Sequence, residues 1–155
     1  MKKDGKTPHK TVNRRASYDY QLLETFEAGI RLYGSEVKAI RLGQADLSGS
    51  YVKIIGSEAY LINAKILPYA YARPEGYDEK RTRKLLLHKR EILALKHKIE
   101  ASGLTIVPLS LYNKRNLIKA ELALGRSKKK FDKKESLKRK DLERQVEEDF
   151  KLKLE

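Results

Sequence analysis

Three observations predict a mostly β fold for this chain. Apolar and polar residues alternate over several segments between residues 18 and 124, which is the pattern of half-buried strands. Only two segments, 36–42 and 88–102, show the apolar spacing of three and four residues that indicates helices. Beyond Leu124 the apolar pattern ends, and lysine and arginine predominate. About six strands with two helices favour an OB-like antiparallel β-barrel with flanking helices, followed by a disordered basic C-terminal tail.

The chain divides into three parts at two changes in composition. Residues 1–12 are polar and include Gly5 and Pro8, so we expect a disordered N-terminal tail. Residues 13–124 hold the alternating segments and form the predicted barrel domain, since 155 residues suffice for one domain with a modest core. Residues 125–155 form the basic C-terminal tail, which begins where Gly125 interrupts the last strand pattern.

The predicted strands can be followed in order along the chain. In the first, Tyr18, Tyr20 and Leu22 share one face, and a one-residue slip of the alternation near Leu23 predicts a β-bulge. Pro108 has no N–H group to donate, so its strand is expected at a sheet edge or bulged. Strands are expected also over 30–33, 51–55, 60–66, 104–111 and 118–124.

Both predicted helices have suitable residues at their ends. Ser35 is a favourable N-cap for the helix over 36–42, and Gly43 is a favourable residue directly after it. The helix over 88–102 ends before Gly103. Both helices carry lysine and arginine on the side that is expected to face solvent.

The charge of the chain predicts a polyanionic partner. There are 35 Lys and Arg against 21 Asp and Glu, which gives a net charge of +14. Nucleic acid is favoured over a membrane surface, because no segment approaches 18 apolar residues and the N-terminus has no signal-peptide core. The absence of cysteine excludes disulfides and thiolate metal sites and favours a cytoplasmic protein.

Signals of catalysis are missing from the sequence. His88 and His97 are nine residues apart, a spacing that fits no helical metal pair, and His9 stands alone. No dinucleotide-binding motif, P-loop or nucleophile elbow is present. We therefore expect a binding protein without a cofactor or a metal, rather than an enzyme.

Three clusters are candidates for contact with a nucleic acid. Residues 80–90 hold six Lys and Arg and no acid, and either grip phosphates or form an ordinary solvated run. The second cluster is Asn13-Arg14-Arg15 followed by Tyr18 and Tyr20. A base could stack on either tyrosine ring, or these rings could pack inward. The third, 68–78, contains three tyrosines among turn residues and is more typical of a flexible loop. From the first two clusters we select as candidate contacts Asn13, Arg14, Arg15, Arg81, Arg83 and Lys84.

The C-terminal tail is too charged to fold alone. Residues 125–140 hold nine Lys and Arg and two Asp and Glu. This segment either remains solvated or folds when a polyanion neutralises it. Leu142, Val146 and Phe150, spaced by four, give the last residues a weak helical stripe.

Four segments occur in a characteristic order and spacing: FEAGIRLYGSEVKAIRLGQADLSGSYV (26–52), RTRKLLLHKRE (81–91), VPLSLY (107–112) and the segment 125–134. Together they resemble the SmpB family, the small tmRNA-binding proteins of bacterial trans-translation, and the resemblance covers about residues 10–140. It implies an OB-like barrel that binds the tRNA-like domain of tmRNA and is not an enzyme. It further implies delivery of tmRNA to stalled ribosomes, with elongation factor Tu as an indirect partner through the aminoacylated tmRNA, and a free protein that is a monomer. A generic RNA-binding barrel and a small RNA-modifying enzyme remain the alternatives.

The resemblance also implies residue roles. The family's tmRNA contacts fall on Asn13, Tyr20, Glu27, Leu86 and His88. Glu27 would accept hydrogen bonds from base or ribose groups, or orient a neighbouring arginine, and Leu86 would give an apolar contact under a base.

In the family the tail becomes helical in the empty mRNA channel and decoding site of the small ribosomal subunit. Phe131 here stands where some members have His, Lys134 where the family has Arg, and Tyr18 where some members have His. The implied ribosome-binding residues are Gly125, Lys128, Lys129, Lys130, Phe131, Asp132, Lys133 and Lys134.

Overall fold

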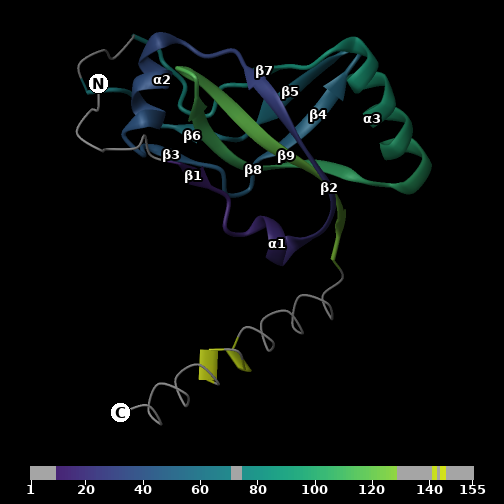
Figure 1. Ribbon diagram of the computed structural model, residues 1–155. Helices are drawn as coiled ribbons and strands as arrows, with labels where there is room; N and C mark the ends of the chain where they lie inside the picture. The colour runs from purple at the N-terminus through teal and green to yellow at the C-terminus, as the bar shows by residue number, and fades with distance from the viewer. Residues whose placement is uncertain (1–9, 71–74, 129–140, 143, 146–155) are drawn as a thin grey trace.

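The computed structural model describes residues 10–70, 75–128, 141–142 and 144–145. Among these residues antiparallel strands are the most abundant regular structure, and the helices lie at the periphery of the sheet (Figure 1). The strands are β1 (Thr11–Val12), β2 (Tyr20–Ile30), β3 (Ala45–Asp46), β4 (Tyr51–Ile55), β5 (Glu58–Ile62), β6 (Lys65–Ile66), β7 (Arg83–Leu86), β8 (Thr105–Lys114) and β9 (Leu117–Ser127). The helices are α1 (Ala16–Asp19), α2 (Gly34–Arg41) and α3 (Lys89–Ser102).

The main sheet curls into a near-closed ring of antiparallel strands. Its order is β1-β8-β4-β5-β7-β2-β9, and β9 pairs again with β8. The pairings of β9 with β2 and with β8 are long, whereas β4 meets β8 only where Val52 lies opposite Ile106. Strand pairing is therefore extensive on both sides of β9 and limited to one residue pair between β4 and β8. The mostly β fold expected from the alternation is confirmed.

Both predicted irregularities in the strands are present. The register of β2 against β9 shifts between Leu22 and Glu24, and that of β8 against β9 shifts between Pro108 and Ser110. Pro108 lies in a strand that pairs on both sides, so of the two predicted ways to accommodate a missing N–H, the bulge is the one used.

The two predicted helices are confirmed with small changes at their ends. Helix α2 begins after Tyr33 rather than Ser35, because the carboxylate of Glu36 accepts the Tyr33 N–H at 2.8 Å. Helix α3 follows His88 and ends at Gly103, whose φ of 62° is the left-handed conformation that glycine adopts most easily.

Other element boundaries differ from the sequence prediction. Tyr18 lies in the short helix α1 and not in a strand; the turn forms as the Asp19 N–H donates to the Arg15 carbonyl. The strand expected over 60–66 is divided at Asn63, where φ is 66°, into β5 and β6. Pairing of β2 stops at Ile30, so 31–33 connect β2 to α2.

The edges of the folded part also differ from the expected ones. Thr11 and Val12, assigned to the N-terminal tail, pair with Leu111 and Ser110 as β1. At the other end, β9 continues past Leu124 to Ser127. Gly125 is thus a buried strand residue opposite Leu22, and does not interrupt the strand. Residues 1–9, 129–140 and 146–155, including the predicted contacts Lys129 to Lys134, lie outside the described residues.

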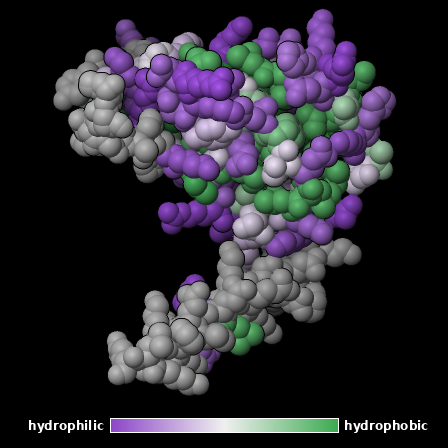
Figure 2. All heavy atoms as spheres, viewed as in Figure 1, coloured by the Kyte–Doolittle hydropathy of each residue, from purple (hydrophilic) through white to green (hydrophobic). Residues whose placement is uncertain are grey.

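The core fills the ring with aliphatic side chains. Leu61, Leu85, Ile106, Leu111 and Leu122 have at most 1% of their surface exposed. Figure 2 shows hydrophobic surface between hydrophilic patches on the face that it presents. In the described part of the chain, no helix is long and apolar enough to cross a membrane.

Candidate nucleic-acid interface

The predicted basic strip, residues 80–90, is divided by a buried ion-pair network. Arg83 is fully buried, and its guanidinium contacts the equally buried Glu36 carboxylate at 2.7 Å. Arg81 makes two hydrogen bonds to the same carboxylate, at 2.6 and 3.0 Å. The Tyr77 hydroxyl donates to Glu36 at 3.0 Å. Arg83 also donates to the carbonyl of Ala64 at 2.7 Å, so its donors are satisfied inside the protein.

This network changes what the strip can do. Arg83 was expected to grip phosphate, but a side chain with no exposed surface cannot reach one while the network is closed. Burial raises the pKa of Glu36, yet the hydrogen bonds from Arg81, the Tyr33 N–H and Arg83 leave that pKa below its usual value. The Glu36 carboxylate is therefore ionised and offsets two buried or partly buried guanidinium groups.

Other basic residues of the strip do reach the surface. The guanidinium of Arg81 lies 3.9 Å from the centre of the Tyr33 ring and keeps part of its surface open. Lys84 pairs with Glu58 at 3.0 Å in an exposed ion pair that an incoming phosphate could replace. Lys80, Lys89 and Arg90 are exposed. The strip thus has exposed cations at both ends, whereas Arg83 in its middle is buried and has a structural role.

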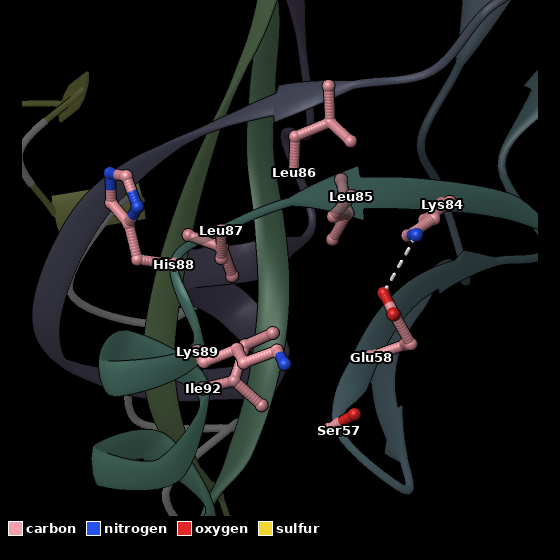
Figure 3. Close-up of a pocket in the computed structure, with 9 residues that line it drawn as sticks. All are labelled: Ser57, Glu58, Lys84, Leu85, Leu86, Leu87, His88, Lys89 and Ile92. Carbon is pink, nitrogen blue, oxygen red and sulfur yellow. Dashed lines mark ion pairs between the residues drawn. The ribbon is translucent and has the colours of Figure 1, made fainter.

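Leu86 and His88 border a groove of about 380 Å³ between the β4–β5 turn and the start of α3. Leu85 is buried and Leu86 is 49% exposed, because successive residues of β7 point to opposite faces. Figure 3 shows Lys84 and Glu58 facing each other at the groove and His88 at the start of α3. The His88 N–H donates to the Glu91 carboxylate at 3.0 Å, which fixes the backbone there and leaves the imidazole exposed.

Glu27 lies on the outer surface of β2 and is held by two side chains of β8. The Tyr112 hydroxyl donates to its carboxylate, and Lys114 Nζ lies 3.3 Å from the other oxygen. The hydrogen bond from Tyr112 is the largest cause that lowers the pKa of Glu27, and Lys114 lowers it further. Burial and the same hydrogen bond raise the pKa of Tyr112.

Asn13 and Tyr20 border a small cavity of about 80 Å³ next to α1. Asn13 Nδ2 donates to the Pro108 carbonyl at 2.9 Å, while its buried Oδ1 has no protein partner. Arg14 and Arg15 are exposed beside it, and the Arg15 guanidinium lies 5.2 Å from the centre of the Tyr18 ring. An unpaired buried acceptor indicates a place for water or for a donor from a ligand.

The bulge in β2 brings these residues to one face of the sheet. Tyr20 lies opposite Ser127, and Glu27 lies opposite Glu121. Ser127 and Glu121 are six apart in β9 and share a face, so Tyr20 and Glu27 share it too, although seven residues separate them. Gly29 continues this face and lies opposite Leu86. The structure therefore places Tyr20, Glu27 and Leu86 on one face of the sheet and leaves Arg83 out.

Three members of this surface were not predicted from the sequence: Lys10, Tyr112 and Lys114. Tyr112 and Lys114 alternate along β8, and Lys10 lies with its Nζ 5.7 Å from the centre of the Tyr112 ring. The spacing of two between Tyr112 and Lys114 indicates from the sequence that their side chains share one face of the strand. Whether Glu27 lies on the same face depends on the bulges in β2 and β8. Gly125 and Lys128, predicted to contact the ribosome, lie against the folded part: Lys128 Nζ donates to the Ser17 carbonyl at 2.8 Å.

An antiparallel ring with a net charge of +14, half-buried tyrosines and exposed cations defines a basic β protein of the nucleic-acid-binding class. Among the described residues, no group of His, Asp and Glu is arranged to hold a metal ion. A family model described as SmpB protein matches residues 10–152. The chain belongs to the SmpB family, as the resemblance of its segments indicated.

Known relatives are similar to the chain over nearly their whole length. The SsrA-binding protein of Chlorobaculum tepidum is 47% identical over 150 residues, which cover 95% of this chain and 96% of the relative. That of Sulfurihydrogenibium sp. is 49% identical over 143 residues, covering 92% and 94%. A solved chain described as "tmRNA-SmpB: a journey to the center of the bacterial ribosome" superposes with a TM-score of 0.66 at 45% identity, covering 83% of this chain and 94% of the other.

Proposed function

We propose that this chain is a tmRNA-binding protein that acts in trans-translation and ribosome rescue, and that it has no catalytic activity of its own. Family membership over residues 10–152 is the observation that supports this function most directly. Its partners are tmRNA and the ribosome, with elongation factor Tu as an indirect partner through aminoacylated tmRNA. It works in the cytoplasm, and the free protein is a monomer.

We also propose that the near-closed ring is an OB-like barrel. The long pairings of β2, β9 and β8 and the bulges that bend two of these strands support this assignment. In such barrels one outer face and the adjoining loops bind nucleic acid. That corresponds here to the face that carries Tyr20, Glu27 and Leu86.

The proposed tmRNA interface combines three kinds of contact. Tyr20 and Leu86 offer surfaces for stacking and apolar contact with unpaired bases. Glu27, His88 and Asn13 offer hydrogen bonds to bases or riboses. The phosphate contacts come from the exposed or partly exposed cations Arg14, Arg15, Arg81 and Lys84, without Arg83.

Specific binding to tmRNA can be separated from general attraction to RNA. The dissociation constants for tmRNA and for an unrelated tRNA should be measured at the same salt concentration, since charge alone gives strong salt-dependent binding. We expect clearly tighter binding of tmRNA. Equal affinity for both RNAs would identify the chain as a general RNA-binding protein instead.

Replacing Glu27 with glutamine should weaken tmRNA binding by about tenfold, the loss expected when an ionic acceptor is replaced by a neutral one. The slope of affinity against salt concentration should change little, because phosphate contacts determine that slope. Filter binding or fluorescence anisotropy at several salt concentrations measures both quantities. A change in the slope alone would contradict a hydrogen-bonding role for Glu27.

Replacing Gly29 with alanine should weaken tmRNA binding about threefold while leaving stability within about 1 kcal/mol of the original. A Cβ atom at this position would lie 3.2 Å from Leu86 Cβ and 3.4 Å from its Cδ1, so the exposed Leu86 side chain must shift. Affinity and thermal unfolding should be measured together. Gly34, where an added Cβ meets nothing within 4 Å, is the matched control for the same substitution.

We further propose that the tail places residues in the empty mRNA channel and at the decoding site. The charge of residues 125–140 supports attraction to ribosomal RNA, and Phe131 with Asp132, Lys133 and Lys134 would supply the positioning contacts. Of the other two residues predicted to contact the ribosome, Gly125 lies in β9 and Lys128 directly precedes residue 129. We propose that both hold the start of the tail on the folded body.

A further inference from the structure

Glu27 is an exposed acid on a strongly basic protein, and its carboxylate is not free to rotate. The Tyr112 hydroxyl donates to one oxygen, and Lys114 Nζ lies 3.3 Å from one oxygen and 3.4 Å from the other. An exposed glutamate without such partners samples several rotamers, and fixing it on binding costs entropy. Here that ordering is already present in the absence of any ligand.

We propose that Tyr112 and Lys114 are positioning residues: they hold Glu27 as an ionised, oriented hydrogen-bond acceptor for a base or ribose donor of the RNA. The inference rests on the proposed function, because it gives Glu27 an RNA partner. Neither Tyr112 nor Lys114 needs to touch the RNA. Their effect on binding passes through the carboxylate.

Three adjacent strands fix this arrangement. Glu27 on β2 lies opposite Glu121 on β9, and Tyr112 on β8 lies opposite Lys119 of the same β9. Tyr112 therefore reaches Glu27 diagonally across one intervening strand, with both side chains rising from paired backbone. A contact built on paired strands is held more precisely than one built on loops.

The surrounding charges keep the carboxylate ionised. Tyr112 and Lys114 face it from β8, Lys119 and Glu121 come from the intervening β9, and Lys10 lies near the Tyr112 ring. The hydrogen bond from Tyr112, helped by Lys114 and Lys119, outweighs the desolvation of the carboxylate, and the pKa of Glu27 is lowered. An ionised carboxylate only accepts hydrogen bonds and repels phosphate, so this point of the surface selects donors on bases and sugars.

The positioning role can be tested first without RNA. The pKa of Glu27 should be measured by NMR of its side-chain carboxyl carbon in the wild type, in Tyr112→Phe and in Lys114→Gln. Both variants should raise the pKa toward the usual value for glutamate, since each loses a group that favours the charged form. Tyr60→Phe, a change of the same kind on β5, should leave it unchanged. An unchanged Glu27 pKa in Tyr112→Phe would overturn the positioning role whatever the protein binds.

The second measurement is a double-mutant cycle in tmRNA affinity. Tyr112→Phe should weaken binding about fivefold in the wild-type background and less than about twofold in a Glu27→Gln background. Equal losses in the two backgrounds would overturn the proposal, since Tyr112 would then act independently of Glu27. No loss in either background would overturn it as well.

The pH dependence of binding provides a third readout. Since the folded pKa of Glu27 is lowered, its acceptor role persists on acidification until the pH falls through that pKa. In Tyr112→Phe the loss of affinity should begin at higher pH. Glu27→Gln is the control: residue 27 cannot titrate in it, so its remaining pH dependence comes from other groups, including the RNA. A shifted carboxyl pKa with unchanged tmRNA binding in Glu27→Gln would overturn the RNA contact itself and thereby separate failure of the proposed function from failure of the positioning.

Discussion

Replacing Glu36 with glutamine is expected to lower the free energy of unfolding by about 3–5 kcal/mol, the usual cost of removing one partner from a buried ion pair. The glutamine would leave Arg83, which has no exposed surface, without its counter-charge, and would replace one of the two oxygens that accept hydrogen bonds from Arg81 with an NH2 group. Urea denaturation at neutral pH measures the loss.

The matched control is Glu58→Gln, which breaks the exposed ion pair with Lys84. That change should cost no more than about 1 kcal/mol, as surface ion pairs generally do. If both variants lost the same small amount, the buried network would not be the stabilising feature that its geometry indicates.

The same carboxylate predicts how stability depends on pH. Because the folded-state pKa of Glu36 is lowered, its contribution is fully present above the unfolded-state pKa and is lost as the pH falls through the folded-state value. The wild type should therefore lose stability on acidification below about pH 4.3, the usual value for glutamate. Glu36→Gln should show a flatter dependence in that range.

Removing residues 129–155 is expected to leave tmRNA binding largely intact and to abolish peptide tagging on stalled ribosomes. The truncation begins after Lys128 and not at Gly125, where the tail was expected to begin, because Gly125, Arg126 and Ser127 pair with Leu22, Gln21 and Tyr20. A cut at 125 would disturb the proposed tmRNA interface and confuse the two functions. A truncation after Lys128 removes only the segment that follows the fold.

Two assays on the same truncated protein decide the outcome: tmRNA affinity and tagging in a purified translation system. A full-length chain with Phe131→Ala and Lys134→Ala is the companion variant, since it keeps nearly all of the tail's charge. It should also lose tagging if these residues position the tail. Full tagging by the truncated protein would contradict the proposed role of the tail.

The sequence predicted β4, β5, β8, β9 and the start of β2 because their alternation is local, but it did not predict β7. The bulge near Leu23 appears in the sequence as a slip of the alternation, and Pro108 predicts its own bulge by lacking an N–H group. The short strands β1, β3 and β6 were not separated out, because a pair of residues contains no usable period. Their pairing depends on partners distant in the chain.

The site was predictable in part, for a related reason. Tyr20, Glu27 and Leu86 were identified through resemblance, and the structure places them on one face. Arg83 was misassigned because a basic run in the sequence does not show which members point inward along β7. Its buried partner, Glu36, lies 47 residues earlier and on another element. Tyr112 was missed because its contact with Glu27 crosses β9, and no local pattern encodes it.

The pairing of Ser127 with Tyr20 fixes where the C-terminal segment starts. The Lys128 N–H donates to the Asp19 carbonyl at 3.0 Å, so the last described residue of the body is attached beside the proposed interface. If the proposed function is correct, the segment that contacts the ribosome begins directly beside Tyr20, where tmRNA binds. Because Lys128 is attached to the body, binding of the body would set the effective concentration of the following residues at their ribosomal target, independently of protein abundance.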